Sequence, residues 1–402
     1  MLSGLRVLDL TFYLPGPYAT LILADLGAEV IKIENPAGGD PLRGLGPDGG
    51  SLAGSVFFQA LNRGKKSVTL DLKTAEGREA FLRLAATADG LVEQYRPGVT
   101  ERLGLGYEAV RAVNPRLAYV SLTGYGQTGP HAAEAGHDLN YMARSGLLSL
   151  FAEAPEGTVA TPFPLPPIQF ADLNGGNLTA TALLAGMLSA RLTGEGRHVD
   201  VAMTDGIVAL LSLTASNYLA AGGPPPERPN LFLAGGEPFY NIYRCADGRH
   251  LSVGALEPKF WANLCQVLAE SDPEKKDPGV IASSREEAAR IFATRTAAEW
   301  VERLAGLDVC VAPILKVAEA LASEHVAARG LVIEAGDVRQ IGPALTVVPA
   351  SEARHRAGAP GSVVASHRPA PRLGEHNREI LLALGYGEAD IQALATRGVI
   401  SE

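Results

Sequence analysis

Two side chains in this sequence have the types and local settings that proton transfer requires, and the first is His137. It lies in a Gly-His-Asp triplet, residues 136–138, at the predicted start of a helix. The positive end of a helix dipole disfavours the charged imidazolium form and would help this side chain act as a base near neutral pH. A His-Asp pair at a helix start is also often structural, with the aspartate holding the imidazole. The local sequence leaves both roles open.

The second candidate is Asp172, at the predicted beginning of a long apolar helix. Aspartate is a common N-cap, because its carboxylate accepts hydrogen bonds from free backbone N–H groups. The small residues Gly175 and Gly176 would also let a ligand approach the backbone closely while the carboxylate faces it. An N-cap and a reactive carboxylate fit the local sequence equally well.

Basic side chains near two predicted strand ends form a third candidate feature. Residues 63–66 (Arg-Gly-Lys-Lys) precede one strand and Lys73 follows it, whereas Arg96 ends the next strand and Arg102 lies in the helix after it. Open α/β sheets bind ligands at the carboxyl ends of their strands, so these groups predict an anionic ligand. Solvated loop charges are the competing interpretation, and the better one for residues 63–66.

Strands and helices alternate along the first half of the chain. Periodicity and helix-end residues predict strands over 5–11, 29–34, 67–72, 90–95, 117–123 and 198–202, and helices over 17–26, 74–88, 99–113 and 171–192. This alternation predicts an α/β fold with a doubly wound parallel sheet. After the first strand, residues 13–18 (Tyr-Leu-Pro-Gly-Pro-Tyr) replace the glycine fingerprint of dinucleotide-binding proteins, so the fold does not imply a dehydrogenase.

A second, smaller domain follows in the predicted organisation. The large domain is expected over residues 1–220, and the Gly-Pro-rich stretch 222–226 is a linker by composition. An Asp-Gly turn inside residues 241–254 predicts a β-hairpin within a small α+β domain over 221–325. The C-terminal segment, 326–402, is expected to return to the large domain.

Composition excludes several classes of protein. The 402 residues carry a formal net charge of -9, which argues against general attraction to nucleic acid or anionic membranes. The three cysteines lack metal-ligand spacing, so neither a zinc site nor a disulfide framework is predicted. The first residues lack the pattern of a secretory signal, and the longest uncharged stretch fits a buried helix better than a membrane span. We expect a cytoplasmic protein in which any anionic ligand meets a local basic patch.

The chain resembles the alpha-methylacyl-CoA racemases over nearly its whole length. The family III CoA-transferases, such as formyl-CoA transferase, have the same framework and share the aspartate that corresponds to Asp172. The motifs that carry the resemblance are residues 5–10, 24–34, 95–105, 124–130, 136–141, 245–248 and 255–258.

The resemblance implies a large doubly wound domain built from both chain ends, a small domain between them, and a homodimer of interlocked chains. Such an interface would make the monomer unstable alone. It implies an acyl-CoA substrate and no metal or other cofactor beyond the CoA moiety. The CoA-binding positions that it carries over are Leu70, Asp71, Leu72, Lys73, Gln94, Tyr95, Arg96, Arg102, Gly136, Asp138 and Tyr141.

The two branches differ at position 137. Racemases of this family carry Gly-His-Asp there, whereas the transferases place a tyrosine where this chain has His137. A further racemase acid, which supports the histidine, corresponds to Glu257, although a carboxylate at a helix start explains Glu257 as well. Asn35 replaces an arginine that touches the nucleotide in both branches, and the proline-rich stretch 154–167 is longer than in the racemases and suggests an altered acyl preference.

These residues predict inversion at the carbon next to a thioester carbonyl. His137 and Asp172 would stand on opposite faces of a 2-methylacyl-CoA and transfer protons through an enolate, which backbone N–H groups would stabilise. In the rival prediction Asp172 attacks the thioester, forms an aspartyl anhydride and transfers CoA to another acid. A third reading is a CoA-binding regulatory module without catalysis.

Overall fold

The computed structural model describes residues 1–47, 54–151, 165–227, 231–347 and 368–401. It divides into two compact units, one of residues 1–145, 166–210 and 324–402, and a second of residues 146–165 and 211–323.

The second segment of the large unit ends at Leu210, ten residues before the predicted boundary at 220. The reason is the helix α9 (Ser212–Ala221), which buries none of its residues and so adds nothing to the core of that unit. The C-terminal part rejoins the large unit at Glu324, close to the predicted position 326. Most of the predicted proline-rich loop at 154–167 lies outside the described residues.

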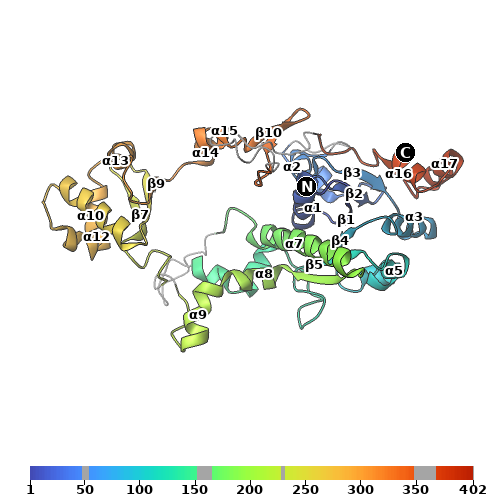
Figure 1. The fold of residues 1–402 in the computed structure, drawn as a ribbon, viewed down its shortest axis with the longest axis horizontal. Helices are drawn as coiled ribbons and strands as arrows, with labels where there is room; N and C mark the ends of the chain where they lie inside the picture. The colour runs from blue at the N-terminus through green and yellow to red at the C-terminus, as the bar shows by residue number, and fades with distance from the viewer. Residues whose placement is uncertain (48–53, 152–164, 228–230, 348–367, 402) are drawn as a thin grey trace. The chain divides into compact units, whose positions relative to one another are not determined.

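Six parallel strands form the central sheet of the large unit, in the order β3-β2-β1-β4-β5-β6 (Figure 1). This order reverses direction between β1 and β4, as in doubly wound folds, and it confirms the predicted α/β class. The strands are β1 (Arg6–Leu10), β2 (Glu29–Glu34), β3 (Lys66–Thr69), β4 (Gly90–Glu93), β5 (Ala118–Thr123) and β6 (His198–Ala202).

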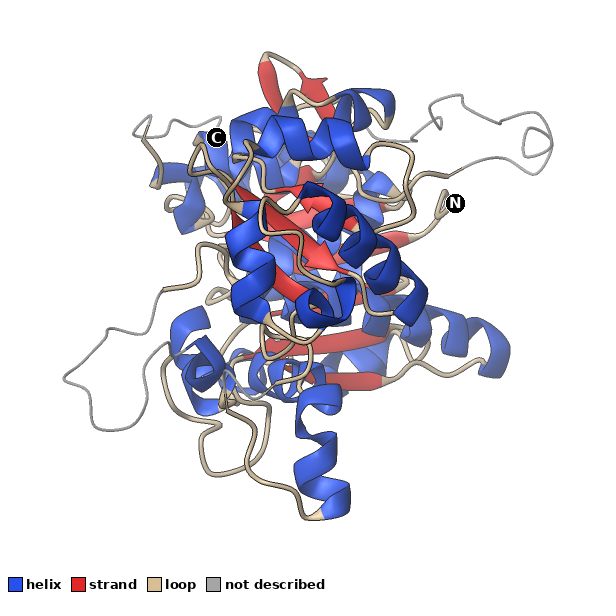
Figure 2. Ribbon diagram, turned by 90° about the vertical axis from the view of Figure 1, so that its left-hand side faces the viewer, coloured by secondary structure: helices blue, strands red, loops and turns tan. Residues whose placement is uncertain are grey.

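Helices cover both faces of this sheet (Figure 2). On one face, α7 (Phe170–Thr193) packs against β4, β5, β6 and the helices α1 (Pro15–Asp25) and α8 (Met203–Leu210). The other face holds a core in which leucine, isoleucine and valine side chains of the strands pack on four helices. These helices are α3 (Ala75–Ala85), α5 (Tyr107–Val113), α16 (Asn377–Ala383) and α17 (Glu388–Thr396).

One predicted helix is broken in two. The segment 99–113 forms α4 (Val99–Leu103) and then α5, because Gly104 takes a left-handed conformation with φ of 72° and ends the first helix. The remaining elements of the large unit are η1 (Pro41–Gly44), α2 (Val56–Asn62), α6 (Asp138–Arg144), α15 (Glu324–Ala328), β10 (Val332–Ala335) and β11 (Val338–Ile341).

The end of the chain is tied to the carboxyl end of β3. The backbone N–H of Asp71 donates to the carbonyl of Val399 at 2.8 Å, and the N–H of Thr69 donates to Oδ1 of Asn377 at 2.8 Å. These bonds join residues more than 300 positions apart, so the large unit is built from both chain ends.

The second unit contains a three-stranded antiparallel sheet in the order β7-β8-β9. Its first two strands form the predicted hairpin around the Asp-Gly turn, and helices with buried Trp300 and Phe292 pack on it. The elements are η2 (Leu147–Phe151), α9, β7 (Tyr240–Arg244), β8 (His250–Gly254), α10 (Pro258–Ser271), α11 (Pro278–Ala282), α12 (Arg285–Phe292), α13 (Ala297–Leu304), β9 (Val311–Pro313) and α14 (Val317–Leu321).

Candidate active site

A cavity of about 550 Å³ lies at the carboxyl ends of β1, β4 and β5. This edge includes the point where the strand order reverses, the usual ligand site of open α/β sheets. Both His137 and Asp172 line the cavity, so the fold brings together two side chains that are 35 positions apart in the sequence. The other lining residues are Phe12, Tyr13, Pro15, Gln94, Tyr95, Arg96, Pro97, Val99, Leu122, Thr123, Gly124, Tyr125, Ala132, Glu134, Ala135, Gly136, Asn140, Tyr141 and Met203.

His137 is the N-cap residue of α6 and its side chain is exposed. Its backbone N–H donates to Oδ1 of Asn140 at 3.0 Å, which fixes the start of the helix. The hydroxyl of Tyr141 donates to the carbonyl of Gly136, so the residue before the histidine is also held. A Cβ atom on Gly124 would lie 2.3 Å from the Tyr141 ring, and only glycine at position 124 leaves room for this ring.

Asp172 lies in the first turn of α7, and burial raises the pKa of its carboxyl group to about 7, with a further contribution from the nearby charge of Asp138. Among the described residues, no donor makes a hydrogen bond to this carboxylate that would oppose the rise. The cavity therefore contains a carboxyl group that exchanges a proton near neutral pH and is available to a ligand.

Asp138 connects the two helices that bear these residues. Its Oδ1 accepts hydrogen bonds from the backbone N–H of Ala171 at 2.7 Å and of Asp172 at 3.1 Å. Burial raises the pKa of Asp138, although the two bonds oppose that rise. The sequence predicted Asp138 as a CoA contact; in the structure its carboxylate caps the first turn of α7, which carries Asp172.

The predicted CoA-binding residues fall into two groups. Gln94, Tyr95, Arg96, Gly136 and Tyr141 line the cavity. Gln94 accepts a hydrogen bond from the N–H of Gly16 at 3.3 Å, and the exposed Arg96 offers a positive charge. The second group lies outside the cavity lining and comprises Asp138 in α6, Arg102 in α4 and the segment Leu70, Asp71, Leu72 and Lys73.

Within that segment, the side chain of Leu70 is buried in the core and Leu72 packs against it. The carboxylate of Asp71 accepts a hydrogen bond from the N–H of Lys73 at 3.0 Å. Lys73 is the basic residue of this segment, and its exposed side chain can offer a positive charge to a ligand.

Removing the Arg96 side chain should weaken CoA binding about tenfold, because a guanidinium–phosphate contact is a charge-assisted hydrogen bond. Arg102→Ala should weaken it less, since Arg102 is not part of the cavity wall. Both residues are exposed, so thermal stability should hardly change. Calorimetric titration with CoA measures the affinity, with Arg111→Ala on the exposed side of α5 as the control. Unchanged affinity in both variants would remove these residues from the site.

Arg63, Lys65 and Lys66 are not the solvated loop charges that the sequence favoured. Lys65 is buried and pairs with Asp9 at 3.1 Å, and Arg63 is buried in an ion pair with Asp25. Lys66 pairs with Glu29 at 2.7 Å. Burial lowers the pKa of Lys65 to about 8, against the attraction of Asp9. These groups hold the sheet and its helices together.

Glu257 is the N-cap residue of α10 in the second unit. Its relation to His137, which lies in the large unit, stays a prediction.

Several cavity residues were missed by the sequence reading, above all Phe12 and Tyr13 after β1 and Tyr125 after β5. A signal was available, because residues that directly follow parallel strands gather at one edge of the sheet. The described residues contain no group of three or more histidine, cysteine or acidic side chains arranged to hold a metal ion. No helix among the described parts of the chain is long and apolar enough to cross a membrane.

Comparison with known proteins assigns the chain to a family. The sequence matches CoA-transferase family III over residues 2–377, so the chain belongs to this family and the predicted resemblance is confirmed. It is 34% identical to alpha-methylacyl-CoA racemase of Mus musculus, covering 100% of this chain and 97% of the relative. It is 35% identical to succinate–glutarate CoA-transferase of Agrobacterium fabrum, covering 95% of each chain.

A solved structure has the same fold. The crystal structure of a CAIB/BAIF family protein from Brucella suis aligns with a TM-score of 0.76 and 30% identity, over 95% of this chain and 98% of that one. The chain is therefore an enzyme of a family that contains both racemases and CoA-transferases.

Proposed function

We propose that this enzyme epimerises 2-methylacyl-CoA thioesters by proton transfer between His137 and Asp172. The observation that carries the proposal is that an imidazole and a carboxyl group line one cavity at the sheet edge. A pKa of about 7 suits Asp172 to giving and taking protons at neutral pH, as general acid–base catalysis requires.

In the proposed reaction, one of these groups removes the α-proton and leaves an enolate. The other group delivers a proton to the opposite face of the same carbon, so the configuration inverts and the proton count balances. Backbone N–H groups in the first turn of α6 would stabilise the negative charge on the thioester oxygen. CoA binding on Arg96 and neighbouring residues would position the acyl group, and no further cofactor is required.

CoA transfer is the second candidate, and the free carboxylate of Asp172 favours it. In this reaction a carboxylate oxygen attacks the thioester carbonyl, the C–S bond breaks and CoA leaves as a thiolate. The incoming carboxylate would then attack the aspartyl carbonyl of this anhydride and release the donor acid. The CoA thiolate would attack the acyl carbonyl of the new anhydride, which forms the second thioester and frees the Asp172 carboxylate. The histidine at position 137, where the transferase resemblance implies a tyrosine, is the reason for preferring epimerisation.

The proposal includes an assembly. We propose a homodimer of interlocked chains, as the family resemblance implies, in which Glu257 supports His137. Light scattering at several protein concentrations would measure the association state.

A single incubation tests the proposed function. A single-epimer 2-methylacyl-CoA in deuterated water should gain one deuterium at the α-carbon and lose its stereochemical purity without any added acid. Mass spectrometry and chiral separation measure the two changes. A parallel incubation with an added free acid detects CoA transfer, and transfer without α-exchange would assign the enzyme to the transferase reaction.

A further inference from the structure

The turn after β1 has an unusual backbone. Tyr13 has a φ of 60°, in the left-handed region that side chains other than glycine seldom adopt. Together with Phe12 it forms part of the cavity wall, and its side chain is 38% exposed. A glycine would adopt this conformation without steric cost. The strain of a tyrosine at this position therefore indicates that its ring has a role in the cavity wall.

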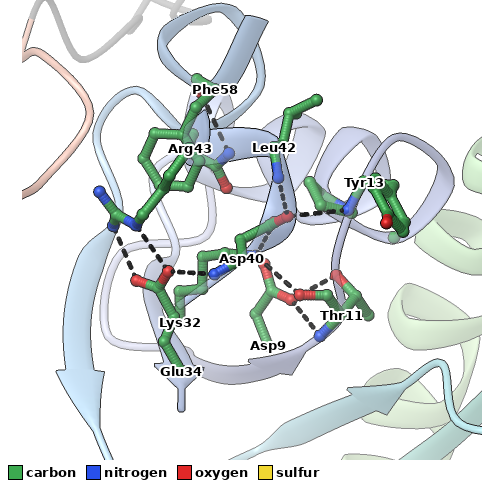
Figure 3. Close-up of polar contacts among 12 residues, drawn as sticks. Asp9, Thr11, Tyr13, Lys32, Glu34, Asp40, Leu42, Arg43 and Phe58 are labelled. Atoms are coloured by element: carbon green, nitrogen blue, oxygen red, sulfur yellow. Dashed lines mark hydrogen bonds and ion pairs between the residues drawn. The ribbon is translucent and has the colours of Figure 1, made fainter. Parts of the chain in front are cut away.

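Asp40 holds this turn from outside the cavity lining. Its Oδ1 accepts hydrogen bonds from the backbone N–H of Tyr13 at 3.1 Å and of Leu42 at 2.9 Å. Its Oδ2 forms an ion pair with Nζ of Lys32 at 3.0 Å, and both side chains are fully buried (Figure 3). The two carboxylate oxygens therefore have different partners: Oδ1 binds backbone N–H groups, including that of Tyr13 in the turn, and Oδ2 binds the ammonium group of Lys32.

Lys32 binds the same turn a second time. Its Nζ donates to the carbonyl of Thr11 at 2.7 Å, and the N–H of Thr11 donates to Oδ1 of Asp9 at 2.9 Å. Burial would lower the pKa of Lys32, but the charges of Asp9, Asp40 and Glu34 outweigh it and the pKa is raised. The lysine stays charged and connects the start of the turn to the tether at Tyr13 (Figure 3).

We infer that Asp40 is a positioning residue of the acyl-CoA site, which acts with Lys32 to hold Tyr13 left-handed and thereby places its ring on the cavity wall. The inference rests on the proposed function in one respect only, that the cavity binds acyl-CoA. The competing explanation is that the buried pair serves folding alone, since removing one partner of such a pair destabilises most proteins.

A double-mutant cycle distinguishes the two explanations. Asp40→Asn leaves a single acceptor oxygen for two tasks, so it must weaken either the tether or the contact with Lys32. Tyr13→Gly removes the ring and the need for a tether. We expect each variant alone to raise the KM for acyl-CoA, and the Kd for CoA, about tenfold, and the double variant to equal Tyr13→Gly. Effects that multiply to about a hundredfold would overturn the inference, because Asp40 would then act independently of Tyr13.

Asp25→Asn is the matched control, because it also removes a buried carboxylate from an ion pair, with Arg63, but does not contact the turn. It should lower the unfolding temperature as Asp40→Asn does and leave KM and Kd unchanged. A rise in KM for this control equal to that of Asp40→Asn would show that general destabilisation explains both.

Calorimetry with CoA keeps the inference separate from the reaction. A non-additive cycle in Kd with no epimerisation by the wild-type enzyme would support the positioning role and overturn the proposed function. Normal epimerisation, together with additive effects of the two substitutions on Kd, would support the proposed function and overturn the positioning role. A wild-type enzyme without affinity for CoA would overturn both.

Discussion

Asp172→Asn should abolish epimerisation, with a loss of at least about a thousandfold in kcat, because an inversion requires a proton-transfer group on each face of the substrate. His137→Ala should have an effect of the same size for the same reason. Each single variant should still exchange the α-hydrogen of one epimer with retention, since the remaining group can remove and return a proton on its own face. Deuterium content and epimer ratio, measured for wild type and both variants, report the two processes separately.

His325→Ala is the control for histidine removal, because His325 is an exposed residue of α15 that does not line the cavity. It should epimerise normally. Near-normal epimerisation by His137→Ala would contradict the proposal that His137 and Asp172 both transfer protons, even if Asp172 proved essential. Loss of CoA transfer in Asp172→Asn, with substantial transfer in His137→Ala, would identify the anhydride reaction.

Asp172→Asn should also stabilise the protein above neutral pH. The folded-state pKa of Asp172 is raised from 3.8 to about 7, so between these pH values the folded protein retains a proton that the unfolded chain has lost. Stability therefore falls as pH rises through this window, and the penalty is complete above pH 7. With allowance for partial exposure, we expect a gain of about 1–3 kcal/mol at pH 8 and almost none at pH 4.

Thermal or urea unfolding of wild type and variant across this pH range measures the difference. Asp205→Asn is the control, because Asp205 is an exposed acid in the first turn of α8, and its replacement should leave stability nearly unchanged at every pH. If the variant is only as stable as the wild type at pH 8, burial of the ionised Asp172 carboxylate does not destabilise the folded protein. The gain would mark a residue whose burial serves reactivity rather than folding.

Much of the fold followed from local patterns in the sequence. Short buried strands alternating with helices predicted the parallel sheet, and the β2 and β6 ranges agree with the structure at both ends. The Asp-Gly turn predicted the β7–β8 hairpin, and the Gly-His-Asp triplet together with the helix start at Asp172 identified two residues that line the cavity. These features depend on periodicity, turns and helix ends within a few residues, and short-range interactions of this kind can be read from one chain segment.

What the tertiary structure alone decided depends on contacts between distant segments. Nothing local to Lys65 or Arg63 shows that carboxylates 56 and 38 residues away bury them in ion pairs. The capping of α7 by Asp138 and the tether from Asp40 to Tyr13 likewise join separate elements. The proton affinity of Asp172 is of the same kind, because its burial and its distance from Asp138 are set by packing. Charge and reactivity in this enzyme depend on desolvation and proximity, and the sequence specifies both only through the completed fold.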